Sequence, residues 1–204
     1  PADLASAGRV PVITGALNLL KKEMGNQLAI GAYILGPYTI VAQVVDIGEL
    51  AKACFKKPDM VSKLLEKAVD LIISLAKLYR EAGADYINIR EMGAGPDILS
   101  PRIFQSLIRP HLERTFATLE SPKVLHICGD SNSIVDQMGV CGADAISVEE
   151  KNNVAETRKK LGPDALVFGN IAGHTVLSVA KPDVVDKMVK EAISNGVNAI
   201  WPGD

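Results

Sequence analysis

Aromatic side chains are scarce in this chain of 204 residues, and neither sign of charge dominates. Phe, Trp and Tyr make up 4% of the sequence, which leaves few rings on which nucleic-acid bases can stack. The formal net charge is −2, so no basic excess is available to neutralise a phosphate backbone. Short basic clusters at 56–57 and 158–160 are typical of solvated helix faces. The composition therefore predicts no nucleic-acid partner.

Long hydrophobic runs and a disulfide framework are also absent from the sequence. No segment reaches the roughly 20 consecutive apolar residues that a membrane-spanning helix needs, and the best candidate, residues 69–77, carries charges at helical spacing. We therefore expect no membrane association. The three cysteines, Cys54, Cys128 and Cys141, are too few for a disulfide scaffold and fit a reducing cytoplasm. We expect Cys54 and Cys141 to pack in the core.

What the chain does contain is a short phrase that occurs three times. Residues 83–89 read GADYINI, residues 142–148 read GADAISV, and residues 196–201 read GVNAIW. Each copy follows a helical stretch, which the glycine ends by adopting a left-handed conformation. Each copy then continues into an apolar run that is typical of a buried parallel strand. The repeated helix-to-strand junction indicates a chain of βαβ units.

Apolar runs and helical periodicity place the remaining elements. Strands are predicted at 28–35, 85–91, 123–128, 144–149, 165–170 and 197–201. Helices are predicted at 59–81, 101–116, 132–138, 153–161 and 182–194. Pro110 falls inside the second of these helices, where we expect it to produce a kink.

Alternating strands and helices leave two architectures, a doubly wound sheet or a (β/α)8 TIM barrel. The six strands are two short of a barrel, and the sequence stops at residues 201–204 directly after a strand. We therefore expect a single α/β domain over residues 1–204, an incomplete TIM barrel truncated at both ends. The open strand edges of such a barrel favour association. We expect further residues or a partner chain to cover them, and a homo-oligomer is one such arrangement.

His126 and Cys128 are the first candidates for chemistry. They are two residues apart near the end of one strand, so their side chains point to the same face. In a barrel, the carboxyl ends of the strands form the active-site face. An imidazole and a thiolate are good zinc ligands. A single His-x-Cys is a weak motif, however, and a pair packed inward without metal is the alternative.

Other strands end in polar residues as well. Glu149 and Glu150 end the strand after His126 and could ligate a metal or accept a proton, although solvated loop acids are the alternative. Glu91, Asn170 and Asp204 end three further strands. Their shared position at strand ends favours a functional site over chance.

Phrases over nearly the whole chain resemble the uroporphyrinogen decarboxylase superfamily, and within it the methylcobalamin:coenzyme M methyltransferase branch. The matching phrases run in family order over 36–42, 83–87, 98–101, 126–129, 142–148 and 168–170. The resemblance implies a (β/α)8 barrel of which strands 3 to 8 are present. It also implies transfer of a methyl group from methylcob(III)alamin to a zinc-activated thiol such as coenzyme M. A corrinoid protein would present the methyl donor.

The same resemblance implies roles for individual residues. His126 and Cys128 would hold zinc together with a later cysteine that follows Pro-Gly at the eighth strand. Here Asp204 follows Pro-Gly, so Asp204 is the candidate third ligand. Glu149 or Glu150 matches an acid of the resting zinc site, and we assign both to catalysis. The remaining strand-end residues, Glu91 and Asn170, are assigned to cofactor binding.

Two other functions stay open at this point. The first is a lyase of the uroporphyrinogen decarboxylase type, which basic residues at the barrel mouth would favour. Only Arg90 lies near a strand end. By the same resemblance, decarboxylases typically lack the His-x-Cys pair and use an N-terminal arginine-containing stretch that is not in this sequence. The second is a non-catalytic barrel fragment. The zinc content of the purified protein distinguishes the three.

Overall fold

The strands of the protein follow one another across a single sheet in chain order. A computed structural model describes residues 3–203, and these form a six-stranded parallel sheet in the order β1-β2-β3-β4-β5-β6. Doubly wound sheets reverse their strand order at a switch point. Because no reversal occurs between these strands, the predicted barrel arrangement is confirmed. The strands are β1 (Gly31–Leu35), β2 (Tyr86–Arg90), β3 (Lys123–His126), β4 (Ala145–Ser147), β5 (Leu166–Ile171) and β6 (Ala199–Pro202).

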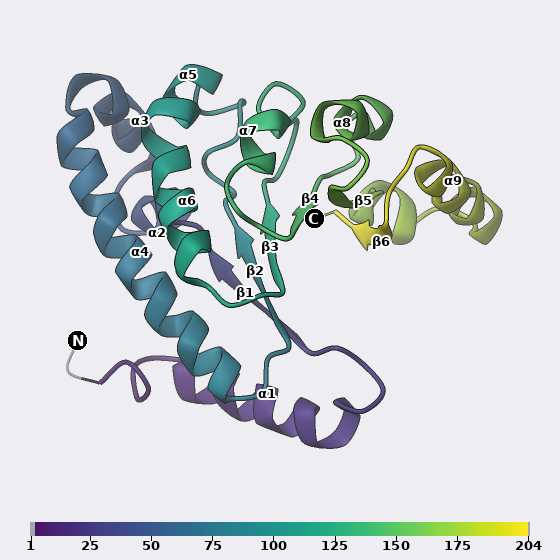
Figure 1. Cartoon of the computed structure of the whole chain (residues 1–204), viewed down its shortest axis with the longest axis horizontal. Helices are drawn as coiled ribbons and strands as arrows, with labels where there is room; N and C mark the ends of the chain where they lie inside the picture. The colour runs from purple at the N-terminus through teal and green to yellow at the C-terminus, as the bar shows by residue number, and fades with distance from the viewer. Residues whose placement is uncertain (1–2, 204) are drawn as a thin grey trace.

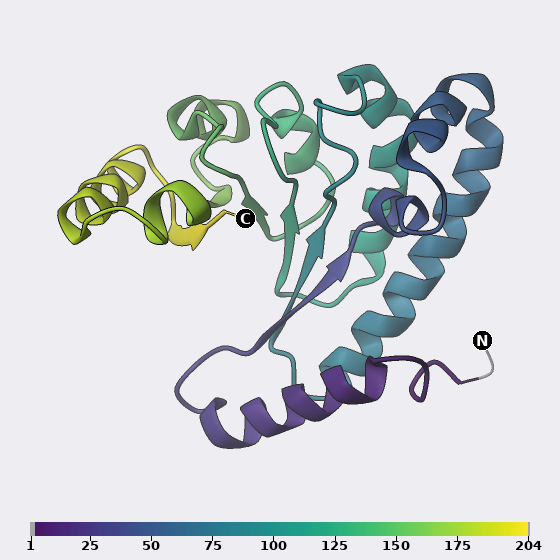
Figure 2. The same cartoon turned by 180° about the vertical axis from the view of Figure 1, so that it is seen from behind.

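Helices cover the outer face of this sheet and leave the inner face open. Figure 1 shows α4 (Pro58–Glu81) and α6 (Arg109–Thr118) in front of the strands. Figure 2, drawn from behind, shows the opposite side of the strands without helices over it. The sheet thus forms part of a barrel wall. The remaining predicted helices correspond to α7 (Val135–Gly139), α8 (Val154–Leu161) and α9 (Pro182–Ser194).

The kink predicted at Pro110 takes the form of a widened helical turn. The helix starts as α5 (Pro101–Ile103), continues as the π-helical segment η1 (Phe104–Ile108), and returns to α-helix in α6. The Arg109 N–H donates to the Phe104 carbonyl five residues back, which is the π-helical pattern. The irregular turn therefore lies just before the proline, which has no N–H of its own to donate.

Four helical segments were not predicted from the sequence. They are α1 (Val10–Met24), α2 (Pro37–Ala42), α3 (Ile47–Lys56) and η2 (Gly173–Leu177). In α1 the apolar residues Val10, Ile13, Leu17, Leu20 and Met24 recur at helical spacing, yet of this stripe only Leu17 is buried. Figure 1 shows α1 lying across the amino ends of the strands. The short α2 starts directly after β1 at Pro37 and places its first turn next to the end of β2.

The core lies between the middle strands and the outer helices. Ile89 and Leu125 on β2 and β3 are fully buried, as are Leu65 and Ile72 on α4. The sheet is less protected at its edges, since β1 and β6 each pair with one strand among the described residues. Tyr33 of β1 is 61% exposed. Among the described residues, no helix is long and apolar enough to cross a membrane.

Candidate metal centre

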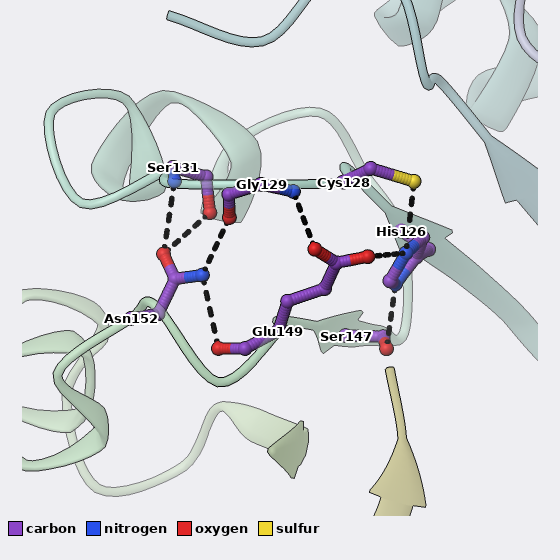
Figure 3. Close-up of polar contacts among 7 residues, drawn as sticks. All are labelled: His126, Cys128, Gly129, Ser131, Ser147, Glu149 and Asn152. Carbon is purple, nitrogen blue, oxygen red and sulfur yellow. Dashed lines mark hydrogen bonds and ion pairs between the residues drawn. The ribbon is translucent and has the colours of Figure 1, made fainter. Parts of the chain in front are cut away.

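His126, the last residue of β3, is held in place by the neighbouring strand. β3 and β4 are parallel and pair His126 with Ser147, the last residue of β4. The imidazole is 2% exposed, and its Nδ1 lies 2.9 Å from the Ser147 Oγ. This hydrogen bond fixes the ring orientation and leaves Nε2 directed at the carboxyl end of the sheet (Figure 3). A histidine metal ligand commonly has its other nitrogen hydrogen-bonded in this way.

Cys128 and Glu149 converge on the His126 Nε2 from the segments that follow β3 and β4. The Cys128 Sγ lies 3.4 Å from Nε2, and the Glu149 Oε1 lies 3.7 Å from it. One ligand atom from each of the three residues lies within 4.8 Å of the others. Figure 3 shows the three side chains meeting at one point. The clustering predicted for His126, Cys128 and Glu149 is therefore present in the structure.

Two of the three spacings among these atoms are close to those around a tetrahedral zinc ion. Bond lengths of about 2.3 Å to sulfur and 2.0–2.2 Å to nitrogen or oxygen put neighbouring ligands of such an ion about 3.4–3.6 Å apart. The two distances from the His126 Nε2, 3.4 and 3.7 Å, agree with these values to within about 0.2 Å. One imidazole, one thiol and one carboxylate are also ligand types that zinc accepts. The donor types and the two distances from the His126 Nε2 thus suit a zinc ion.

A buried asparagine joins the two loops that carry these ligands. The Asn152 Nδ2 donates to the carbonyls of Gly129 and Glu149 at 2.9 and 3.1 Å. Its Oδ1 accepts from the backbone N–H and the hydroxyl of Ser131 at 3.0 and 2.8 Å. The Gly129 N–H in turn donates to the Glu149 Oε2 at 2.7 Å, which leaves Oε1 facing His126. The loops after β3 and β4 are therefore one hydrogen-bonded unit.

Burial and nearby charges keep both His126 and Cys128 electrically neutral. Burial, and then the positive charge of Arg90, lower the pKa of His126 to about 4, although Glu149 opposes this. Burial and the Glu149 carboxylate raise the pKa of the Cys128 thiol to about 11, while Arg90 opposes the rise. At neutral pH the site therefore holds an uncharged imidazole ready to ligate and a thiol that must lose its proton to a metal.

Glu150 and Asn170 lie outside the three-residue cluster. Glu150 is exposed. Its Oε2 lies beside Gly203, close enough that a Cβ built on this glycine would be 3.2 Å from it. The side-chain amide of Asn170, on β5, donates to the Asn152 carbonyl at 3.1 Å. Asn170 therefore supports the loop after β4. Asp204 lies outside the described residues, and its role as a ligand stays a prediction.

Glu91 is fully buried at the end of β2 and faces the start of α2. Its carboxylate accepts hydrogen bonds from the backbone N–H groups of Tyr38 and Thr39, both at 2.9 Å, and from the Thr39 hydroxyl. Burial raises the pKa of Glu91 to about 7, against the lowering effect of these donors. These contacts give Glu91 a structural place beside α2, and its assignment to cofactor binding stays a prediction. Thr39 lies within α2, whose N-cap is Gly36.

The sequence analysis missed the residues that support the cluster. Ser147 could have been found, because the predicted strands 123–128 and 144–149 bring it to the same level as His126 once they are paired. Asn152 and Ser131 gave no signal, since polar residues in loops are ordinary. The other cysteines behave as expected: Cys54 and Cys141 are buried, and all three cysteines are free.

Comparison with known proteins places this cluster in a family context. The family model described as uroporphyrinogen decarboxylase (URO-D) matches residues 1–200. A methylcobamide:CoM methyltransferase, MtaA, from Methanosarcina barkeri is 32% identical over 204 residues, covering 100% of this chain and 60% of the relative. A uroporphyrinogen decarboxylase from a Nostoc species is 28% identical over 192 residues, covering 88% of this chain and 53% of the relative.

A solved structure supports the same placement. A methyltransferase from Methanosarcina mazei superposes with a TM-score of 0.95 at 32% identity, covering 100% of this chain and 60% of that chain. The chain thus spans between half and two thirds of the length of these known proteins. The superposition covers all six strands, so the longer methyltransferase chain contains the same arrangement of strands.

Proposed function

The chain belongs to the uroporphyrinogen decarboxylase family, and from that premise we propose that it is a corrinoid-dependent methyltransferase. It moves a methyl group from methylcob(III)alamin to a zinc-activated thiol such as coenzyme M. The observation that carries this proposal is the convergence of His126, Cys128 and Glu149, in which the Cys128 Sγ and the Glu149 Oε1 lie 3.4 and 3.7 Å from the His126 Nε2. The relatives named for methyl transfer to CoM support the choice of reaction.

Three side chains of the protein would hold the zinc ion in this proposal. His126 binds through Nε2, Cys128 through its sulfur, and Glu149 through Oε1, while Asp204 is the candidate for a further ligand. Zinc bound here supplies a Lewis acid that lowers the pKa of a coordinated thiol, so that a thiolate forms at neutral pH. Ser147 holds the imidazole, and the Gly129 N–H holds the carboxylate, so the ligands are arranged before the metal arrives.

The chain would act in the reaction by holding the acceptor sulfur in line with the methyl carbon. The corrinoid would supply the methyl group and would keep the electron pair of the broken cobalt–carbon bond, while the acceptor sulfur held by the chain would form the new sulfur–carbon bond. Glu149 would hold the zinc ion less tightly than Cys128, because a carboxylate is a weaker zinc partner than a thiolate, and its position would be the one open to the acceptor thiol. A corrinoid protein presents the donor at the open face of the sheet.

A decarboxylase remains the second candidate, since uroporphyrinogen decarboxylases are also among the relatives. Such an enzyme needs basic groups for several carboxylates of its substrate. Arg90 is the charged residue among those lining the cavity beside His126, and a single guanidinium is a weak match for that requirement. The cluster of His126, Cys128 and Glu149 has no role in this alternative.

We also propose that the protein works in a reducing cytoplasm and that its open strand edges are covered. Three free cysteines and the absence of disulfides fit a reducing cytoplasm. The edges of β1 and β6 carry backbone groups that further strands of a barrel would pair. We propose that additional barrel strands or a second copy of the chain cover these edges.

Elemental analysis of protein purified without chelators tests the proposed function. We expect near-stoichiometric zinc in the wild type and a large loss in Cys128→Ser and His126→Ala. Glu149→Gln and Glu150→Gln form a matched pair, of which only the first should weaken zinc binding. Cys141→Ala is the control for removal of a buried cysteine. A protein without zinc that also fails to bind added zinc contradicts the methyltransferase proposal.

A further inference from the structure

A small cavity lies on the inner face of the sheet, directly beside His126. Its volume is about 210 Å³, which is below the range of about 300–1,000 Å³ that is typical of drug-sized ligands. β1, β2, β3 and β6 all contribute to its lining, which includes Tyr33, Asn88, Arg90, His126 and Trp201. The cavity therefore suits a molecule of only a few heavy atoms that reaches the metal centre.

Arg90 supplies the positive charge of this cavity. It is the last residue of β2 and pairs in register with His126 across the sheet. Its guanidinium carbon lies 5.5 Å from the centre of the Tyr33 ring, a cation–π distance that holds the side chain over the inner face. Arg90 also hydrogen-bonds to Cys128. The guanidinium thus lies between the cavity and the sulfur ligand.

Asn88 provides a second polar group in the same cavity. It precedes Arg90 by two residues on β2, so both side chains project from the same face of the sheet. Asn88 is 6% exposed, and its Oδ1 has no hydrogen-bond partner among the described residues. Buried amide oxygens are rarely left without a partner. An amide can present either its oxygen or its NH2 group, so Asn88 is suited to a polar ligand.

We propose that Arg90, assisted by Asn88, binds the anionic tail of the acceptor and thereby selects short thiols that end in a sulfonate or carboxylate. This inference rests on the proposed function. Two sulfur ligands of a tetrahedral zinc ion lie about 3.8 Å apart, so the acceptor sulfur would sit next to Cys128 and within a short tail's reach of Arg90. A guanidinium has five donors and contacts the thiolate and an anion at the same time.

Thiols that differ only in their tails test this assignment. Isothermal titration calorimetry with the zinc-loaded chain compares 2-mercaptoethanesulfonate, 3-mercaptopropionate and the neutral 2-mercaptoethanol. We expect at least one of the charged thiols to bind about tenfold or more tightly than 2-mercaptoethanol, as charge-assisted hydrogen bonds allow. In Arg90→Met this advantage should disappear, so that charged and neutral thiols bind equally well; the comparison is made with saturating zinc, because Arg90 also contacts the ligand Cys128. Arg90→Lys should restore part of the advantage, and Arg102→Met, which alters an exposed arginine on α5, should retain all of it.

Several results would overturn the inference. One is equal affinity of the wild type for charged and neutral thiols. Another is an Arg90→Met protein that retains zinc but loses affinity for 2-mercaptoethanol as strongly as for the charged thiols. If no thiol binds, the proposed function fails, and ethanesulfonate, which has the anion without the thiol, then decides the inference. Ethanesulfonate binding that Arg90→Met and Asn88→Ala weaken supports the anion site, and the absence of such binding rejects it.

Discussion

The His126 Nδ1 and the Ser147 Oγ lie 2.9 Å apart across the paired ends of β3 and β4. This contact joins the metal centre to the sheet itself, because each partner is the last residue of its strand. It leaves Nε2 as the ring nitrogen that faces Cys128 and Glu149. The orientation of the candidate ligand is therefore set by strand pairing, which does not depend on the loops.

Removal of this hydrogen bond should weaken metal binding without abolishing it. We expect Ser147→Ala to lower the zinc affinity about 10- to 100-fold, as is typical when the partner of a histidine ligand is removed. Competition with a chromophoric chelator measures the change. Ser194→Ala, which alters an exposed serine at the end of α9, is the control. Unchanged affinity in Ser147→Ala would mean that packing alone orients the imidazole.

Zinc uptake should release a proton, and that proton should come from Cys128. Burial raises the pKa of the Cys128 thiol to about 11, so the thiol is protonated at pH 7 and must ionise to bind the metal. The pKa of His126 is lowered to about 4, so the imidazole is already neutral and releases none. Titrations in buffers of different ionisation enthalpy count the protons released.

The pH dependence of zinc affinity follows from the same two groups. Between about pH 5 and 9 one proton competes with the metal, so the affinity should rise about tenfold per pH unit. Below about pH 4, protonation of His126 adds a second competing proton and steepens the fall. Cys128→Ser should remove the slope in the upper range. A pH-independent affinity in the wild type would show that the thiol does not ligate.

Loss of Asn152 should destabilise the fold around the site. The side chain is 4% exposed and makes four hydrogen bonds, three of them to the loop after β3 and one within the loop after β4. In Asn152→Ala the Ser131 N–H, the Ser131 hydroxyl and the Gly129 carbonyl lose these hydrogen bonds, and we expect a cost of about 1–3 kcal/mol in the free energy of unfolding. Urea denaturation measures it, with exposed Asn195→Ala on the C-cap of α9 as the control. An unfolding free energy equal to that of the wild type would contradict the bridging role.

The sheet was predictable from the sequence because its signals are local. A glycine such as Gly83 or Gly142, with φ of 103° and 88°, ends a segment and precedes a buried strand in the structure, as the repeated phrase indicated. Those signals come from neighbouring residues in the sequence, so they can be recognised without knowledge of the tertiary contacts. The helix α1 was predictable by the same kind of signal, since Val10, Ile13, Leu17, Leu20 and Met24 recur at helical spacing, although the structure buries only Leu17 of them.

The details of the site depend on directions that sequence spacing does not reveal. Glu149 and Glu150 are adjacent acids after the same strand, yet the Gly129 N–H fixes only Glu149 toward His126. Glu91 also follows a strand, but the backbone N–H groups at the start of α2 bind its carboxylate. Each outcome is decided by a partner that is distant in the sequence. The position of these acids at strand ends therefore predicted that they lie near the same edge of the sheet. The direction in which each carboxylate points could be learned only from the structure.

Asp204 leads to the last prediction, which concerns the sulfur content of the zinc site. The family resemblance implies a cysteine as a zinc ligand where this chain has Asp204. A carboxylate keeps the formal charge of a thiolate but donates less electron density to the metal, so a bound thiol ionises more readily and attacks less strongly. We expect Asp204→Cys to retain stoichiometric zinc and to raise both the pKa of a bound thiol and its rate of methylation.

Asp204→Ala should instead lower zinc affinity. Metal analysis and the pH profile of thiol binding measure these effects, and unaltered zinc affinity in Asp204→Ala would remove Asp204 from the ligand set.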